Sequence, residues 1–149
     1  FIGNKKGIDN RKMKTAGYSG TSLTKKLGIK NGYKIKIVNE PEGYFKLFND
    51  LPIDLEILTD NKTKKDFIHY FVGNVIQLEK EIKLLSKEIE QNGALWISWP
   101  KKTSKIETDL NGNIVREIGL KNGLVDIKVC AVNEIWSGLK FVIPIKDRK

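Results

Sequence analysis

The sequence predicts a single α/β domain with a largely parallel central sheet and an antiparallel strand at its C-terminal edge. Two almost wholly apolar runs, residues 67–72 and 94–99, are typical of parallel strands covered on both faces. Between them, apolar residues step by three and four over residues 75–89, which predicts an amphipathic helix that Gly93 ends. Two buried strands joined by a helix form a βαβ unit, and this unit indicates the fold class.

The elements before this unit are shorter. Thr21 or Ser22 can cap a short helix that ends at Gly28, because glycine readily adopts the left-handed conformation there. Alternation and turn residues then predict a strand at 33–39, a turn at 39–43, a short helix at 44–48 and a second strand at 55–58.

Residues 106–120 allow two interpretations. Asn111 and Gly112 suit the two-residue turn of a hairpin, but Asn111 can also cap a helix with one apolar face. We favour the helix, because consecutive buried strands normally require a crossover. Residues 124–132 and 138–145 predict the last two strands, and their short connection requires an antiparallel pair.

Composition excludes several classes of function. Cys130 and His69 are single residues of their kind, so no internal disulfide can form and a zinc site of Cys and His lacks ligands. No run approaches the roughly 20 apolar residues of a membrane span. We expect a cytoplasmic protein. The net charge of +9 suggests a polyanionic partner, but lysines outnumber arginines, so nucleic-acid binding ranks third among the functions considered.

Residues 1–12 differ from the rest of the chain. They precede Met13, the only methionine, and carry more basic than acidic residues. We expect a flexible leader or upstream extension at 1–12 and one domain at 13–149.

Three idiosyncratic segments carry a resemblance to a known family. AGYSGTSLTKKLGIK (16–30), ALWISWPKK (94–102) and GLVDIKVCAVNEIWSGLKFV (123–142) resemble a bacterial family catalogued only as domain of unknown function 3052. The likeness covers nearly all of residues 13–149. The chain departs from the family at Ser22, which is commonly proline, and at Asn133, which is commonly aspartate. The resemblance implies a Rossmann-like three-layer sandwich of a trimmed, methyltransferase-like kind, and it implies no particular activity.

A nucleotide or S-adenosylmethionine site in such a fold would show a glycine-rich turn after the first strand. Residues 39–43 contain one glycine, a proline and two carboxylates that would repel a phosphate. Asp60 is the only acidic residue placed to hold ribose hydroxyls after the second strand. We therefore expect no cofactor and a non-catalytic ligand-binding or regulatory module, with a methyltransferase-related enzyme that has a non-standard cofactor loop as the alternative.

The run LWISWPKK (95–102) indicates where a ligand would bind. Pro100 cannot continue a central ladder, so the chain leaves the sheet at the carboxyl edge, where open α/β sheets bind ligands. Lysines and a serine follow, which predicts an anion-tolerant rim for a small anion if strands 33–39 and 94–99 are neighbours. The alternative is a core of tryptophans with solvated lysines. The candidate binding residues are Asn39, Pro41, Trp99, Lys101, Lys102, Ser104, Lys128 and Trp136.

No catalytic group emerges from the remaining polar residues. Asp126, Lys128 and Cys130 alternate, so we expect them on one face of their strand, where Lys128 would lower the pKa of the Cys130 thiol. We nevertheless interpret Cys130 as a small buried hydrophobe and His69 as a hydrogen-bonded core histidine.

Overall fold

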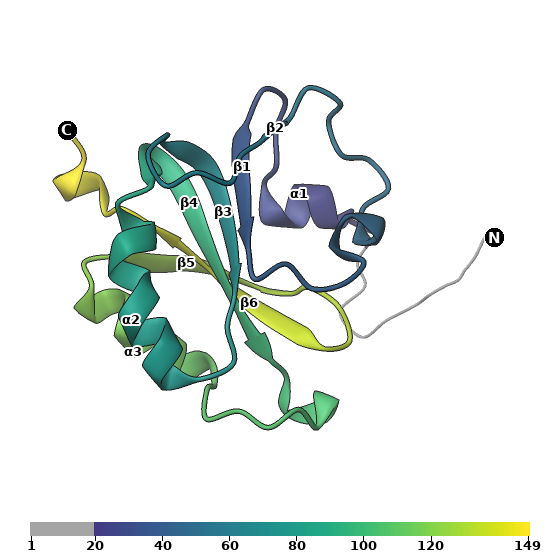
Figure 1. Cartoon of the computed structure of the whole chain (residues 1–149), viewed down its shortest axis with the longest axis vertical. Helices are drawn as coiled ribbons and strands as arrows, with labels where there is room; N and C mark the ends of the chain where they lie inside the picture. Colours follow the sequence, from purple (N-terminus) through teal and green to yellow (C-terminus); the bar gives the residue numbers. More distant parts are fainter. Residues whose placement is uncertain (1–19) are drawn as a thin grey trace.

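A computed structural model describes residues 20–149, and the expected leader at 1–12 lies outside them. Six strands form one mixed sheet in the order β2-β1-β3-β4-β6-β5. Figure 1 shows α2 and α3 on one side of this sheet and α1 on the other, which confirms the three-layer α/β sandwich. The elements are α1 (Leu23–Leu27), β1 (Lys34–Val38), η1 (Tyr44–Leu47), β2 (Glu56–Ile57), β3 (Lys65–Phe71), α2 (Val75–Ser86), β4 (Ile89–Pro100), η2 (Lys102–Ser104), α3 (Gly112–Lys121), β5 (Val125–Ala131), β6 (Trp136–Val142) and η3 (Ile145–Asp147).

The strand order corrects one premise of the sequence argument. The strands β2, β1, β3 and β4 are parallel, but β3 lies between β1 and β4, so β1 and β4 are not neighbours. The chain goes outward from β1 to β2, returns to the other side of β1 as β3, and continues to β4. The order therefore reverses between β1 and β3, while the carboxyl ends of all four strands still share one edge.

The two C-terminal strands are antiparallel, as predicted. The strand β6 runs against β4 and β5 and lies between them, so β5 forms the edge of the sheet. This order follows from the long crossover through α3, which carries the chain past one strand position before β6 returns to fill it.

Each face of the sheet has its own apolar core. Alternate residues of β3 and β4, such as Ile68 and Leu95, pack with α2 and α3, and Leu78 and Val115 complete that cluster. On the other face, β1, β3 and β4 pack against α1 and the segment between β1 and β2. Trp96 belongs to this second cluster, and its indole N–H donates to the carbonyl of Leu27 at 2.9 Å.

The end of α2 differs from the prediction. The helix ends at Ser86 and not near Gly93, and Ile89 is the first residue of β4, where it pairs with Lys65. The apolar periodicity continued across this boundary because Ile89 is buried in the same core as the helix. Gly93 instead lies where β4 is irregular, and a Cβ there would approach the carbonyl oxygen of Lys65 to 3.0 Å.

Local capping signals were read correctly. Ser22 caps α1 by accepting from Lys25 N, and Gly28 ends the helix with φ of 80°. The helical interpretation of residues 106–120 is confirmed, since Asn111 caps α3 by accepting from Ile114 N at 2.9 Å. These signals act within one turn of chain, so tertiary packing does not override them.

A bulge in β5 overturns the expected face shared by Asp126, Lys128 and Cys130. Asp126 pairs with Phe141 and Lys128 with Lys140, so Ile127 is an extra residue between them. The bulge places Asp126 on the α3 side of the sheet, where its carboxylate lies 3.2 Å from Nε of Arg116.

Among residues 20–149, no helix has the length and apolar character that crossing a bilayer demands.

Candidate functional site

The reversal of strand order places a candidate site between the carboxyl ends of β1 and β3. Open α/β sheets bind ligands at such points, because the two connections diverge and leave a crevice. Asn39 follows β1 directly, and its backbone is left-handed with φ of 58°. Its side-chain amide donates to the carbonyl of Phe71, the last residue of β3, at 3.0 Å. This hydrogen bond ties the two strand ends together at the reversal.

Two glycines lie on either side of this point. Gly43 ends the turn after β1 with φ of 76°, and Gly73 follows β3. A Cβ at either position would meet no heavy atom within 4 Å. The backbone is therefore open to a ligand on both sides of the reversal, although the turn at 39–43 is not rich in glycine.

A chain of buried polar groups lies beneath the turn. The Tyr44 hydroxyl is 2.9 Å from Nδ1 of His69, and Nε2 of His69 is 2.8 Å from Oγ of Ser98. All three side chains are buried, and burial lowers the pKa of His69 to about 3. The ring of Phe71 stacks on His69 with centroids 4.2 Å apart. His69 is thus the hydrogen-bonded core histidine that we expected, and it is closed to substrate.

The segment after η2 covers the carboxyl end of β3 from the other side. Thr108 donates its hydroxyl to the carbonyl of Gly73 at 2.6 Å, and Asp109 accepts from Val75 N at 2.9 Å. Asn74 caps α2 by accepting from Gln77 N. Protein groups therefore satisfy two of the first amides of α2, and the sequence argument did not foresee this contribution of Asp109.

Several candidate residues lie at this edge. The Lys101 amide donates to the carbonyl of Ile135 at 2.7 Å, and the Ser104 hydroxyl donates to the carbonyl of Lys101 at 2.6 Å. Lys102 is exposed. Trp136 meets Phe71 edge to face with centroids 5.0 Å apart. Because Phe71 also receives the Asn39 hydrogen bond, Trp136 and Asn39 flank the same residue.

The other candidates have different surroundings. Trp99 is 7% exposed and belongs to the core under α2 and α3, so it is the core residue of the alternative interpretation. The Lys128 ammonium donates to the carbonyl of Lys26 at the end of α1. Pro41 stays in the turn, where its carbonyl accepts from Tyr44 N at 3.2 Å. The sheet arrangement determines the face on which Trp99 lies, and the bulge determines the face on which Lys128 lies. Local sequence reveals neither feature.

Asp60 and Cys130 do not contribute to the edge. Hydrogen bonds from Thr63 lower the pKa of Asp60 to about 2, and its carboxylate lies 3.4 Å from the buried ammonium of Lys65. Burial raises the pKa of Cys130 and outweighs the lowering by nearby lysines, Lys128 among them, so the expectation of a lowered thiol pKa is wrong. Within residues 20–149, no group of three or more His, Cys, Asp or Glu side chains could hold a metal ion.

The residues that the sequence argument missed are Phe71, Gly73 and Tyr44. Gly73 directly follows an apolar strand and precedes a helix cap, which is the position of a ligand-binding turn in this architecture. That signal is present in the sequence, but the sequence analysis did not use it. The burial of Tyr44 on His69 had no local signal, since the two residues are 25 positions apart.

Comparison with known proteins identifies the fold. No family model matches the chain, and no curated protein matches it in sequence. A ribosomal protein L11 methylase from Lactobacillus delbrueckii subsp. bulgaricus aligns with a TM-score of 0.53 at 12% identity, over 81% of this chain and 74% of that chain. The DhpI–SAH complex aligns with a TM-score of 0.53 at 8% identity, over 74% of this chain and 77% of that chain.

A third match is NcsB1, an O-methyltransferase from neocarzinostatin biosynthesis solved with S-adenosylmethionine and 2-hydroxy-5-methyl naphthoic acid. It aligns with a TM-score of 0.58 at 5% identity, over 79% of this chain and 50% of that chain. At these identities the likeness shows the fold alone. The chain has the α/β sandwich of methyltransferases.

These matches contradict the expectation that the chain takes no cofactor. Two of the three structures contain S-adenosylmethionine or SAH, so the chain shares its fold with proteins that bind such ligands. The expectation rested on the lack of a glycine-rich turn at residues 39–43. In open α/β sheets the ligand position follows from the strand order, whatever the number of glycines in the turn.

Proposed function

We propose that the chain is a methyltransferase-related protein that binds an S-adenosyl ligand between the ends of β1 and β3. The observation that carries the proposal is the reversal of strand order at Asn39 and Phe71, in a sheet whose solved relatives in fold hold this class of ligand. The resemblance to the family of unknown function 3052 agrees with this proposal and stays a prediction.

The charges of the turn suit this ligand better than a dinucleotide. Glu40 and Glu42 are exposed carboxylates in the turn after β1. S-adenosylmethionine contains no phosphate and carries a sulfonium cation, an ammonium group and ribose hydroxyls, all of which a carboxylate attracts or accepts from. A pyrophosphate would be repelled by the same side chains. The open space at Gly43 and Gly73 lets a ligand reach the backbone beside them.

The side chains around the site support ligand binding, and none of them is assigned a catalytic role. When bound, S-adenosylmethionine supplies an electrophilic methyl group. His69 and Cys130 are buried, so neither can deprotonate an acceptor held at the surface. Asn39 holds the turn against β3 through its hydrogen bond to Phe71. The rim formed by the partly buried Lys101 and the exposed Lys102 offers cations for the carboxylate of the ligand's amino-acid part.

Calorimetric titration with S-adenosylmethionine and SAH tests the proposal. We expect both ligands to bind with dissociation constants on the order of micromolar, and ATP to bind at least about tenfold more weakly. Gly73→Val should weaken both ligands without unfolding the protein, because the added side chain enters open space. Glu117→Val, a surface change on α3, is the control for introducing valine.

Charge variants then separate the two ends of the ligand. The double variant Glu40→Gln with Glu42→Gln should weaken S-adenosylmethionine about fivefold more than SAH, because only the former carries the sulfonium charge. Replacing Lys101 and Lys102 by alanine should weaken both ligands equally, since both carry the carboxylate. Failure of either ligand to bind at about 1 mM would overturn the proposal.

A further inference from the structure

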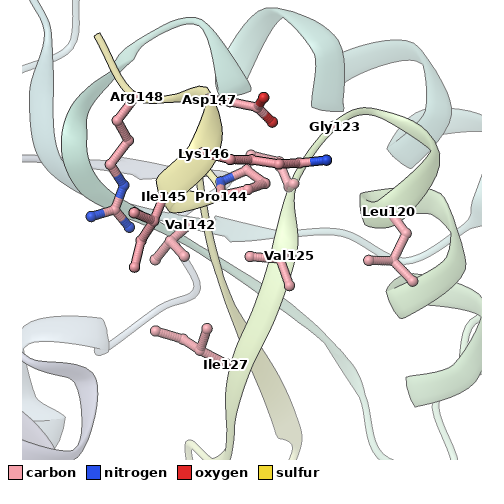
Figure 2. Close-up of a pocket in the computed structure, with 11 residues that line it drawn as sticks. Leu120, Gly123, Val125, Ile127, Val142, Pro144, Ile145, Lys146, Asp147 and Arg148 are labelled. Atoms are coloured by element: carbon pink, nitrogen blue, oxygen red, sulfur yellow. The ribbon is translucent and has the colours of Figure 1, made fainter.

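The amino edge of the sheet carries a pocket that is separate from the candidate site at the strand-order reversal. It has a volume of about 650 Å³ and lies between the end of α3, the start of β5 and η3. Figure 2 shows Leu120, Val125, Ile127 and Ile145 around it. Pockets of several hundred Å³ with mainly apolar walls are the usual size and kind of small-molecule sites. This pocket lies at the opposite edge from Asn39, because Val125 begins a strand that runs parallel to β4.

A smaller polar pocket adjoins the apolar one. Its volume is about 200 Å³, and it shares Ile127, Val142 and Arg148 with the first pocket. Lys140 also lines it. Arg148 is fixed by a hydrogen bond from Nε to the carbonyl of Ile143 at 2.9 Å. In Figure 2 its guanidinium points to the side of Ile145 and Val142, away from Lys146.

The cations of the smaller pocket are not fully balanced by protein groups. Lys140 lies directly across from Lys128 in the β5–β6 ladder, and like charges in that position are destabilising. Burial, with the charges of Lys128 and Lys30, lowers the pKa of Lys140. Asp66 also lines the smaller pocket, where its carboxylate accepts from Lys34 N at 2.8 Å and offsets one of the two positive charges of Lys140 and Arg148. An anion beside Lys140 and Arg148 would relieve this repulsion.

We propose that the two adjoining pockets form one binding site for an aliphatic chain with a single anionic head group. The chain fills the apolar pocket, and a carboxylate or phosphate head lies between Arg148 and Lys140. A second copy of the protein fits this surface less well. The bulge at Ile127 and the lysine at position 128 both disfavour edge-to-edge pairing of β5, so the exposed Ile127 and Val129 are poorly suited to a dimer strand.

Titrations with alkyl anions below their micellar concentrations test this site. We expect octanoate, decanoate and decyl phosphate to bind, with affinity rising about fourfold for each methylene added until the pocket is full. Decanol should bind at least about tenfold more weakly than decanoate, because it lacks the charge. The ratio of decyl phosphate to decanoate affinity distinguishes an alkyl phosphate from a fatty acid as the natural class.

Two substitutions assign the ends of the ligand. Ile145→Asp places a charge in the apolar pocket at a side chain that is 80% exposed, so the fold should survive and all chain lengths should bind at least about tenfold more weakly. Ile53→Asp, at a fully exposed isoleucine that lines neither pocket, is its control. Arg148→Gln should weaken decanoate but not decanol, whereas Lys62→Gln should change neither.

Three titration results would overturn the proposal. They are the absence of decanoate binding at about 1 mM, affinity that does not depend on chain length, and equal losses in the control variants. A dimer in solution that Ile145→Asp dissociates would overturn it in favour of an interface between copies. Binding of S-adenosyl ligands is measured separately, and its failure would leave the alkyl-anion site intact.

Discussion

At the scale of single residues, His69 shows how this protein handles a buried ionisable group. The imidazole is fully enclosed and bonds to a hydroxyl on each side, those of Tyr44 and Ser98. A neutral imidazole can accept one of these bonds and donate the other, whereas the charged form can only donate. Burial lowers its pKa to about 3, so the neutral form persists in the folded state.

This pKa predicts a pH dependence of stability. Above the pKa of about 6.5 in the unfolded state, His69 is neutral in both the folded and unfolded states. It then has no effect on the slope of the free energy of unfolding against pH. As pH falls below about 6.5, only the unfolded state gains a proton. The free energy of unfolding should therefore fall by up to about 1.4 kcal/mol per pH unit until the folded pKa near 3. Urea unfolding at pH 7.5, 6.5, 5.5 and 4.5 measures this slope.

The variant His69→Gln separates this effect from other groups. Glutamine keeps a donor and an acceptor but does not titrate, so the variant should be less stable at pH 7.5 and show a flatter slope between pH 6.5 and 4.5. Asp60, whose pKa is lowered to about 2, contributes a loss only below about pH 4. An unchanged slope in the variant would show that His69 is not the source.

Residue positions were predictable from sequence where the cause is local. Ser22, Gly28 and Asn111 act within one helical turn, and each has the role that was assigned to it. The surroundings of Trp99 and Lys128 were harder to predict, because the face on which a strand residue lies depends on register and bulges. One extra residue at Ile127 was enough to separate Lys128 from Asp126.

At the scale of elements, α3 packs unusually closely on β6. Gly119 faces Phe141, and a Cβ on this glycine would lie 2.1 Å from the ring, which is far inside van der Waals contact. The backbone of α3 thus rests on an aromatic ring that is wholly buried. This approach also positions Leu120 and Gly123 at the mouth of the alkyl-anion pocket.

We predict that Gly119→Ala lowers the free energy of unfolding by roughly 1–3 kcal/mol, because the ring or the helix must move. Gly112→Ala is the matched control in the same helix. Its Cβ would make an ordinary contact of 3.6 Å with Trp99, so stability should be unchanged or slightly higher. Adding Phe141→Leu to Gly119→Ala should recover part of the loss, and chemical denaturation of the four proteins measures each value. Equal stability of the two alanine variants would contradict this packing.

The boundaries of helices and strands are harder to predict from the sequence pattern than their types. The helix α2 ended seven residues before Gly93, although the apolar periodicity continued to Ile89. Periodicity records which side chains are buried in a shared core, and a following strand can supply the next one. Gly93 was interpreted as the residue that stops the helix. The position instead requires glycine because the backbone of β3 approaches it closely.

At the scale of the whole molecule, the fold class was predictable but the site was only partly so. Strand and helix types follow from the pattern, and the βαβ unit implies a parallel sheet. The place where strand order reverses depends on which side of β1 the third strand joins, and no local residue specifies that side. Asn39 was among the candidate residues named from the sequence, while its hydrogen-bond partner Phe71 emerged only from the sheet order.

The same architecture leaves part of the sheet without a helix above it, since α2 and α3 pack mainly on β4, β5 and β6. Beside β1, a charged cluster takes that place. The ammonium of Lys65 is wholly buried and lies 3.0 Å from Glu88, and the ammonium of Lys36 lies 2.9 Å from the same oxygen. Both lysines also donate to the carbonyl of Asp60. Glu88 is therefore the anion that both lysines share, and the Asp60 carboxylate, 3.4 Å away, is a second anion for Lys65 alone.

We predict that Glu88→Gln lowers the free energy of unfolding by about 3–5 kcal/mol, because it leaves two clustered ammonium groups with too little compensating charge. The double variant Lys65→Met with Glu88→Leu should lose much less, since it removes a buried charge of each sign. Glu90→Gln, two residues along the chain and partly exposed, is the control and should stay within about 0.5 kcal/mol of the parent. Urea denaturation at pH 7 provides the comparison. A double variant as unstable as Glu88→Gln would show that shape, and not charge balance, governs this part of the sheet.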